Sequence, residues 1–180
     1  MEALIAKNDL NLGDIVRAAV AGDDYALARI VDAFHDDMVN VCVVVSRDRG
    51  LAEEAVQSAW AIAWRKLGSV REPERLRPWL VRIAVNEAKQ LMRKQSRHPG
   101  VEYISEGPER PGGIDPATGI DSLDLRAALE RLEPDDRALL AMRYVAGFDA
   151  TELAAAAGLS PSGMRARLSR LLARVRQELE

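Results

Sequence analysis

Two helix-start signals separated by a glycine lie in the last third of the chain, between Asp149 and Pro161. Asp149 predicts an N-cap, with Glu152 placed to complete a capping box, and Gly158 predicts the left-handed turn that ends an alanine-rich helix of about two turns. Ser160 and the proline after it predict a second helix, because the missing N–H of proline is tolerated at the first helical position. This pattern is typical of a helix-turn-helix, whose second helix enters the major groove of DNA.

The helix that begins at Pro161 has one apolar side and one side of small residues. The apolar stripe consists of Met164, Leu168, Leu171, Leu172, Val175 and Leu179, and the opposite side of Ser162, Gly163, Ala166, Ser169 and Arg170. Small side chains let a helix approach base edges, while guanidinium groups reach phosphates or guanine. The candidate DNA contacts are Ser162, Arg165, Arg167, Arg170 and Arg174. The alternative is an ordinary solvated basic helix that closes an α-bundle.

Charge is distributed unevenly along the 180 residues, whose formal net charge is -3. Residues 1–64 carry a net charge of -6 and residues 98–121 of -4, whereas residues 65–97 carry +7 and residues 122–180 are neutral. The acidic parts should weaken nonspecific binding of the free protein to DNA. We therefore expect that a partner is needed to bring the chain to DNA.

Residues 98–120 contain nine prolines and glycines and no periodic apolar pattern, which predicts a flexible linker or a merely disordered spacer. Helical periodicity dominates on both sides of it. We therefore predict an all-α fold of two small helical domains, residues 1–97 and 121–180, with the helix-turn-helix in the second.

Four helices are predicted before the linker, at about residues 12–21, 24–46, 51–67 and 76–96. The expected breaks are Gly22-Asp23, Asp48-Arg49-Gly50 and residues 68–73. The apolar run at residues 41–45 predicts a buried helix face. Trp60 and Trp64 recur at helical spacing in the third helix and are interpreted most simply as core residues.

The fourth predicted helix and the loop before it carry a second basic surface. On its polar side, Glu87 alone interrupts the positive charge, whereas a solvated bundle face is usually mixed in sign. Asn86 is a candidate base or phosphate contact, and Trp79 a candidate stacking platform. The candidate nucleic-acid contacts are Arg75, Arg77, Trp79, Arg82, Asn86, Lys89, Arg93, Lys94 and Arg97.

An enzyme is the weakest interpretation. The two histidines, His35 and His98, form no metal-ligand spacing with a cysteine, so neither a metal nor a cofactor nor a catalytic residue is expected. The adjacent acids Asp36-Asp37 and Asp135-Asp136 diverge by about 100° on a helix and are interpreted as solvated charges rather than as an acid pair. Cys42 is expected to be a buried hydrophobe. With neither a bilayer-spanning run nor a signal peptide, the chain is expected in the cytoplasm, without membrane insertion.

Several motifs together resemble the bacterial RNA polymerase sigma factors of the extracytoplasmic-function type. Those that resemble the first conserved domain of the family are Leu51-Ala-Glu-Glu-Ala-Val-Gln57, Ala63-Trp-Arg65 and Pro78-Trp-Leu-Val-Arg-Ile-Ala-Val-Asn86. Those that resemble the second are Leu129-Glu-Arg-Leu-Glu-Pro134, Arg143-Tyr-Val-Ala-Gly147, Glu152-Leu-Ala154, Gly158-Leu-Ser160 and Arg165-Ala-Arg-Leu168. The two sets occur in the family's order and flank a short linker.

The resemblance implies a promoter-specificity subunit that binds core RNA polymerase and promoter DNA. It assigns polymerase binding to the helix of Glu53, Glu54 and Gln57. It assigns opening and reading of the minus-ten element to the segment that ends at Arg97, with Asn86 at the melted strand. The helix that begins at Pro161 would read the minus-thirty-five duplex through Arg165, Arg167 and Arg170. An anti-sigma factor is a further partner that the resemblance suggests.

The chain departs from the family pattern at Gly163, Ser169, Leu172 and Gln90, where the family often has threonine, histidine, a basic residue and an acid. These departures predict an unusual promoter preference. Two other functions compete with the sigma factor. One is a free-standing helix-turn-helix regulator whose first domain senses a signal, and the other is a sigma-like adaptor that has lost DNA reading.

Overall fold

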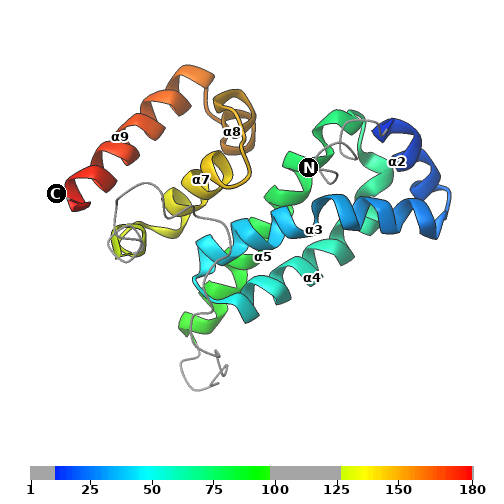
Figure 1. Ribbon diagram of the computed structural model, residues 1–180, viewed down its shortest axis with the longest axis horizontal. Coiled ribbons are helices and arrows are strands. Elements are labelled where there is room, and N and C mark those ends of the chain that lie inside the picture. The colour runs from blue at the N-terminus through cyan, green and yellow to red at the C-terminus, as the bar shows by residue number, and fades with distance from the viewer. Residues whose placement is uncertain (1–10, 98–126, 180) are drawn as a thin grey trace, which may run out of the picture.

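The computed structural model describes residues 11–97 and 127–179, and every regular element in these two ranges is helical. The first range contains α2 (Leu12–Val20), α3 (Asp24–Ser46), α4 (Arg49–Lys66) and α5 (Leu76–Arg97), with the short 3-10 turns η1 (Leu67–Ser69) and η2 (Pro73–Arg75). The second contains α7 (Pro134–Tyr144), α8 (Ala150–Ala157) and α9 (Pro161–Leu179). The all-α prediction is confirmed (Figure 1). The linker predicted at residues 98–120 lies outside the described residues.

The first unit is a bundle of α3, α4 and α5, with α2 packed on α3 and on the two 3-10 turns. Side chains at the helix starts explain the boundaries: Asp23 accepts hydrogen bonds from the N–H groups of Tyr25 and Ala26, and Asn11 from that of Asp14. The predicted spans 12–21, 24–46 and 76–96 agree with α2, α3 and α5 to within one residue. The buried face predicted at residues 41–45 is confirmed, since Cys42 is fully buried there.

The start of α4 differs from the prediction. Arg47 adopts the left-handed conformation, with φ 63°, and Asp48 caps α4 by accepting a hydrogen bond of 3.0 Å from the N–H of Leu51. The helix therefore begins at Arg49, and Gly50 lies inside its first turn rather than in the break. The aspartate cap explains the difference, because it stabilises a helix start without a glycine.

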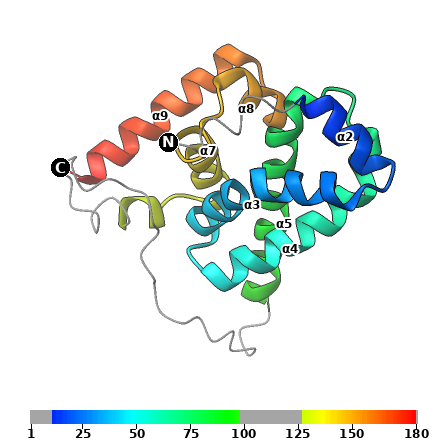
Figure 2. The same ribbon diagram turned by 45° about the vertical axis from the view of Figure 1, so that its right-hand side comes forward.

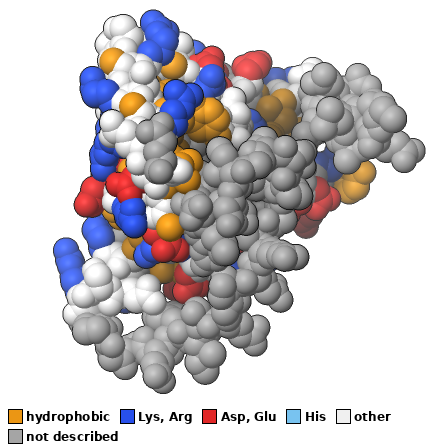
Figure 3. Space-filling view, turned by 60° about the vertical axis from the view of Figure 1, so that its left-hand side comes forward, with side chains coloured by type: hydrophobic (Ala, Val, Ile, Leu, Met, Phe, Trp, Pro, Cys, Tyr) orange, Lys and Arg blue, Asp and Glu red, His pale blue; other side chains and the backbone are white. Residues whose placement is uncertain are grey.

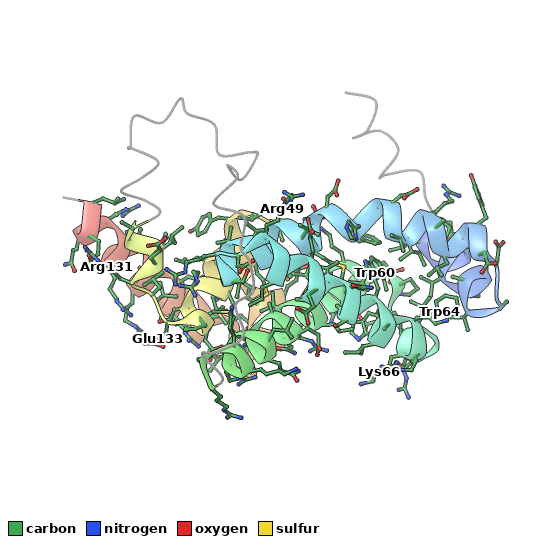
Figure 4. All side chains as sticks on the ribbon, turned by 90° about the horizontal axis from the view of Figure 1, so that it is seen from below. Arg49, Trp60, Trp64, Lys66, Arg131 and Glu133 are labelled. Atoms are coloured by element: carbon green, nitrogen blue, oxygen red, sulfur yellow. The ribbon has the colours of Figure 1, made fainter. Side chains whose placement is uncertain are left out.

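The two tryptophans of α4 differ in their surroundings. Trp60 is half-buried, and its indole N–H donates a hydrogen bond of 3.2 Å to Nδ1 of His35 on α3. Trp64 is 44% exposed, so its assignment to the core was wrong. Its place in the last full turn of α4, near the end of the bundle, accounts for this exposure (Figure 4).

The second unit contains the predicted helix-turn-helix. Asp149 caps α8, and Glu152 completes the capping box, its side chain accepting from the N–H of Asp149 at 2.8 Å. Gly158 ends α8 with φ 66°, and α9 begins at Pro161. The predicted apolar stripe of α9 faces the core: four of its residues are buried and the other two are partly buried against the core.

The conformation of Gly158 leads to a stability prediction. A Cβ atom there would meet nothing within 4 Å, so replacement by alanine adds only the cost of the left-handed backbone. We expect Gly158→Ala to lower the free energy of unfolding by about 1–2 kcal/mol in urea titrations followed by circular dichroism. Gly50→Ala is the matched control and should raise the free energy by up to about 1 kcal/mol, because Gly50 is helical. Equal effects of the two substitutions would contradict the role of the turn.

Helix α7 joins the two units. It packs on α8 and α9 within the second unit, and also on α3 and α5 of the first. The two ribbon views agree that α7 lies between the helix-turn-helix and the bundle (Figures 1 and 2). The arrangement brings the basic helix α5 close to the acidic start of α7.

Candidate nucleic-acid interface

Helix α9 presents its polar side to solvent because its apolar side is used in packing. Ser160 caps the helix, its Oγ accepting a hydrogen bond of 3.1 Å from the N–H of Gly163. Met164 and Leu168 are buried below, whereas Ser162 and Ala166 on the opposite side are exposed. The helix-turn-helix therefore offers a small-residue surface that fits close approach to a duplex.

The arginines of α9 fall into two groups. Arg165 and Arg170 are exposed and form no ion pair with any described residue. Arg167 instead contacts Asp136 at the start of α7 at 2.6 Å, and Arg174 lies 3.5 Å from the other oxygen of that carboxylate. Two candidate contacts are thus free for DNA, while two are held by an acid of their own unit.

Helix α5 carries an aligned polar stripe. Arg82, Asn86, Lys89 and Arg93 are separated by four, three and four residues, so they lie within about 60° of one another around the helix. Arg82, Asn86 and Arg93 are exposed. An open hollow of about 400 Å³ continues the stripe toward the end of α5 and is lined by Gln90, Arg93, Lys94 and Arg97. This stripe fits a backbone-tracking surface for nucleic acid.

Four of the candidates on and before α5, one of them a member of this stripe, are engaged within the protein. Arg75 pairs with Glu72 at 2.8 Å, and Lys89 pairs with Asp135 of α7 at 2.8 Å. Arg77 pairs with Asp37 of α3 at 2.7 Å and also lies over the ring of Phe148, 5.5 Å from its centroid. Trp79 is half-buried against the core, so only part of its ring is accessible for the predicted stacking.

The prediction of solvated charges holds for one acid of each adjacent pair: Asp36 and Asp135 are exposed, whereas Asp37 and Asp136 are partly buried. Asp37 is 20% exposed and paired with Arg77, and Asp136 is 16% exposed between two arginines. Asp135 is 70% exposed, and the hydrogen bond from Lys89 lowers its pKa. The difference within each pair has a geometric cause: adjacent residues diverge by about 100° around a helix, so one carboxylate is partly buried against arginines while its neighbour is exposed.

Basic and acidic side chains both lie on the described part of the face seen in Figure 3. Seen from the side of α9, Lys and Arg side chains stand at intervals along the molecule with Asp and Glu between them (Figure 3). An alternating surface of this kind agrees with the modest net charge of -3. We therefore expect weak nonspecific affinity for DNA.

The candidate polymerase-binding residues are exposed on one helix. Glu53, Glu54 and Gln57 all lie on α4, and Glu53 also pairs with Arg49 at 2.9 Å. Trp64 follows Glu53 by eleven residues, which places it within about 20° of that residue around α4. Sequence reasoning missed this exposed aromatic residue, although its spacing from Gln57 was a signal.

Comparison with known proteins decides the family. The profile of sigma-70 region 2 matches residues 30–98, and that of sigma-70 region 4 matches residues 122–175. The chain is 26% identical over 171 residues to the ECF RNA polymerase sigma factor SigM of Mycobacterium tuberculosis, covering 94% of this chain and 85% of that protein. The chain belongs to the extracytoplasmic-function sigma factors. Sigma factors are promoter-specificity subunits of RNA polymerase and are in general non-catalytic.

Two further similarities extend over most of this sigma factor. It is 31% identical over 170 residues to the probable RNA polymerase sigma factor RfaY of Xanthomonas campestris, covering 89% of this chain but 42% of the length of RfaY. The solved structure of the sigma factor RpoE in complex with the anti-sigma factor NepR from Bartonella quintana matches with a TM-score of 0.60 and 28% identity. That match covers 79% of this chain and 89% of RpoE.

Three further observations concern metal ligands, membrane spans and the cysteine in the part of the chain that the structure describes. No group of three or more potential ligands among His, Cys, Asp and Glu is gathered for a metal within residues 11–97 and 127–179. Within the same ranges, no helix combines the length and apolarity needed to cross a bilayer. Burial raises the pKa of the Cys42 thiol to about 12, which agrees with its interpretation as a core residue.

Proposed function

We propose that this sigma factor binds core RNA polymerase and directs initiation at a subset of promoters. In this proposal α9 reads the minus-thirty-five duplex, and the stripe of α5 binds the melted minus-ten strand. The observation that carries it is the outward face of α9, where Arg165 and Arg170 are exposed beside small residues in a helix-turn-helix. The proposed domains remain residues 1–97 and 121–180, joined by the linker at residues 98–120, and the proposed location is the cytoplasm.

The test is transcription by core polymerase with the purified chain on a library of genomic fragments. We expect a small set of defined start sites that core polymerase alone does not use. If the chain neither bound core polymerase nor selected starts, the proposal would be lost. A gel shift with the free chain distinguishes a sigma factor from a free-standing helix-turn-helix regulator, because the regulator must bind a specific duplex sequence without polymerase.

Exposed side chains of α4 are the proposed contacts with polymerase. Aromatic residues often dominate protein interfaces, and Trp64 lies on the same side of α4 as Glu53 and Gln57. We expect Trp64→Ala to weaken binding to core polymerase by about 1–2 kcal/mol, roughly 5- to 30-fold, in a fluorescence binding titration. Tyr25→Ala is the matched control, because Tyr25 is 74% exposed on another helix. Equal losses from the two variants would exclude a specific role for Trp64.

An anti-sigma factor is a further proposed partner. The support is the similarity to RpoE of Bartonella quintana, which was solved in complex with NepR. Such an antagonist would need to cover surfaces that polymerase or DNA uses, so the proposed site on this chain is the polar faces of α4 and α5. Purified core polymerase should then compete with the antagonist for the chain.

A further inference from the structure

A partly buried carboxylate of α7 pairs with two arginines of α9. The side chain of Asp136, in the first turn of α7, is 16% exposed, and its Oδ1 accepts a hydrogen bond of 2.6 Å from Arg167. Its Oδ2 lies 3.5 Å from a guanidinium nitrogen of Arg174. The positive end of the helix dipole favours a carboxylate in the first turn of α7. One acid therefore holds two of the cations that the sequence assigns to DNA.

The two held arginines lie on one flank of α9. Arg167 and Arg174 are seven residues apart, which places them within about 20° of one another around the helix and about 10 Å apart along it. The exposed small residues Ser162 and Ala166 lie about 80–140° away around the same helix. When a helix lies in the major groove, its outward side faces the base edges and its flanks face the phosphates. The two arginines are therefore placed for phosphate contact rather than for base reading.

The charge of Asp136 decides whether these arginines are available to phosphates. If Arg167 turned to a phosphate, the partly buried carboxylate would lose its nearest partner, which is costly at a site with little access to water. Arg174 is 56% exposed and lies farther from the carboxylate, so it would be the first to turn to DNA if that charge were removed. Phosphate contacts strengthen binding to every duplex alike. Holding these two cations therefore removes affinity that carries no sequence information.

We propose that Asp136 is a specificity-determining positioning residue of the helix-turn-helix. It holds Arg167 and Arg174 beside α7, which limits the phosphate contacts of α9 and fixes the helix at one angle. Base contacts from Arg165 and Arg170 then decide which duplex is bound. The proposal rests on the proposed function for the reading of the minus-thirty-five duplex by α9. A merely structural ion pair differs from it in sign, because loss of such a pair would weaken binding to all duplexes.

Asp136→Asn in the full chain is the test, since it removes the charge and keeps the size of the side chain. Binding to a mixed-sequence duplex is measured by fluorescence anisotropy at several salt concentrations. We expect binding roughly three- to tenfold tighter at low salt, and a slope of log K against log salt that is steeper by about 1, because about one more phosphate is neutralised. Glu133→Gln is the matched control, because Glu133 is exposed at the start of the same helix and makes no side-chain cap hydrogen bond. Its slope should stay within about 0.3 of that of the unchanged chain.

Arg174→Gln provides a second test that does not depend on the stability of Asp136→Asn. With Asp136 intact, this substitution should leave the salt slope unchanged, because Arg174 is held by the carboxylate. In the Asp136→Asn background it should remove most of the added slope. A lower slope from Arg174→Gln alone would overturn the proposal, since Arg174 would then already contact phosphate.

Selectivity is measured with core polymerase, as the ratio of transcripts from a selected promoter to those from the same promoter with a scrambled minus-thirty-five element. We expect Asp136→Asn to lower this ratio roughly three- to tenfold, because the added phosphate contacts favour both templates while α9 is held less firmly for base reading. Equal changes on both templates, an unchanged salt slope, or the same effects from Glu133→Gln would overturn the proposal. If the unchanged chain selected no promoter, the proposed function would fail, whereas the salt slopes would still confirm or overturn the holding of the two arginines by Asp136.

Discussion

Leu80→Ala should lower the free energy of unfolding of the first unit by about 2–5 kcal/mol, the largest effect expected in this chain. Leu80 is fully buried on α5, which packs on both α3 and α4, so its truncation leaves a cavity at the centre of the bundle. A loss of this size is a large fraction of the stability of a small domain. We also expect the variant to lose polymerase-dependent transcription, because α5 and α4 would no longer be held in place.

Tryptophan fluorescence in urea is the appropriate measurement, because all three tryptophans, Trp60, Trp64 and Trp79, lie in the first unit. Val20→Ala is the matched control, since Val20 is 51% exposed on α2 and its truncation should change stability by less than about 0.5 kcal/mol. A loss below about 1 kcal/mol for Leu80→Ala would mean that the bundle relaxes around the cavity, which contradicts close packing of α5.

Local signals were enough to predict most of the helices, although no span was predicted for α7. Caps, glycine turns and apolar periodicity act within a few residues, so α2, α3 and α5 and the helix-turn-helix follow from the sequence. The start of α4 was predicted two residues too late, because Asp48 and Gly50 were both assigned to the break between α3 and α4. The aspartate is in fact the cap, and Gly50 lies within the helix.

Contacts between distant residues could not be predicted in this way. Nothing near Arg137 in the sequence indicates that its guanidinium meets the carbonyl of Val45, 92 residues away. The pairing of Arg167 with Asp136 could not be predicted either, because the two residues are 31 positions apart. The sequence analysis therefore treated this arginine as a free candidate contact with DNA. The exposure of Trp64 depends on where the neighbouring helices end, and the apolar periodicity within α4 contains no information about that. The exposed faces of α4, α5 and α9 were predicted more reliably than the partners of the charges on them.

The site residues of α9 lead to the second large prediction, Arg170→Ala. Arg170 is exposed on the small-residue side of α9 and makes no ion pair with any described residue, so its removal should leave the fold unchanged. We expect the variant sigma factor, bound to polymerase, to lose about 1–3 kcal/mol in promoter binding, roughly 5- to 150-fold, if the guanidinium contacts a base in bidentate fashion. Binding to duplexes with a changed minus-thirty-five element is the measurement. Arg176→Ala, an exposed arginine in the last turn of α9, is the control.

Arg167→Ala and Arg170→Ala should differ in their effect on stability, and this difference separates a direct contact with DNA bases from a role in holding the helix-turn-helix in place. Both should weaken promoter binding, but Arg167→Ala also leaves the half-buried carboxylate of Asp136 with Arg174 as its remaining charged partner, so it should lower stability as well. Restoring the fold with a stabilising osmolyte should then recover part of the binding of Arg167→Ala and none of that of Arg170→Ala. An equal loss of affinity for every duplex sequence with Arg170→Ala would reassign this residue from base reading to phosphate contact, because phosphate contacts carry no sequence information.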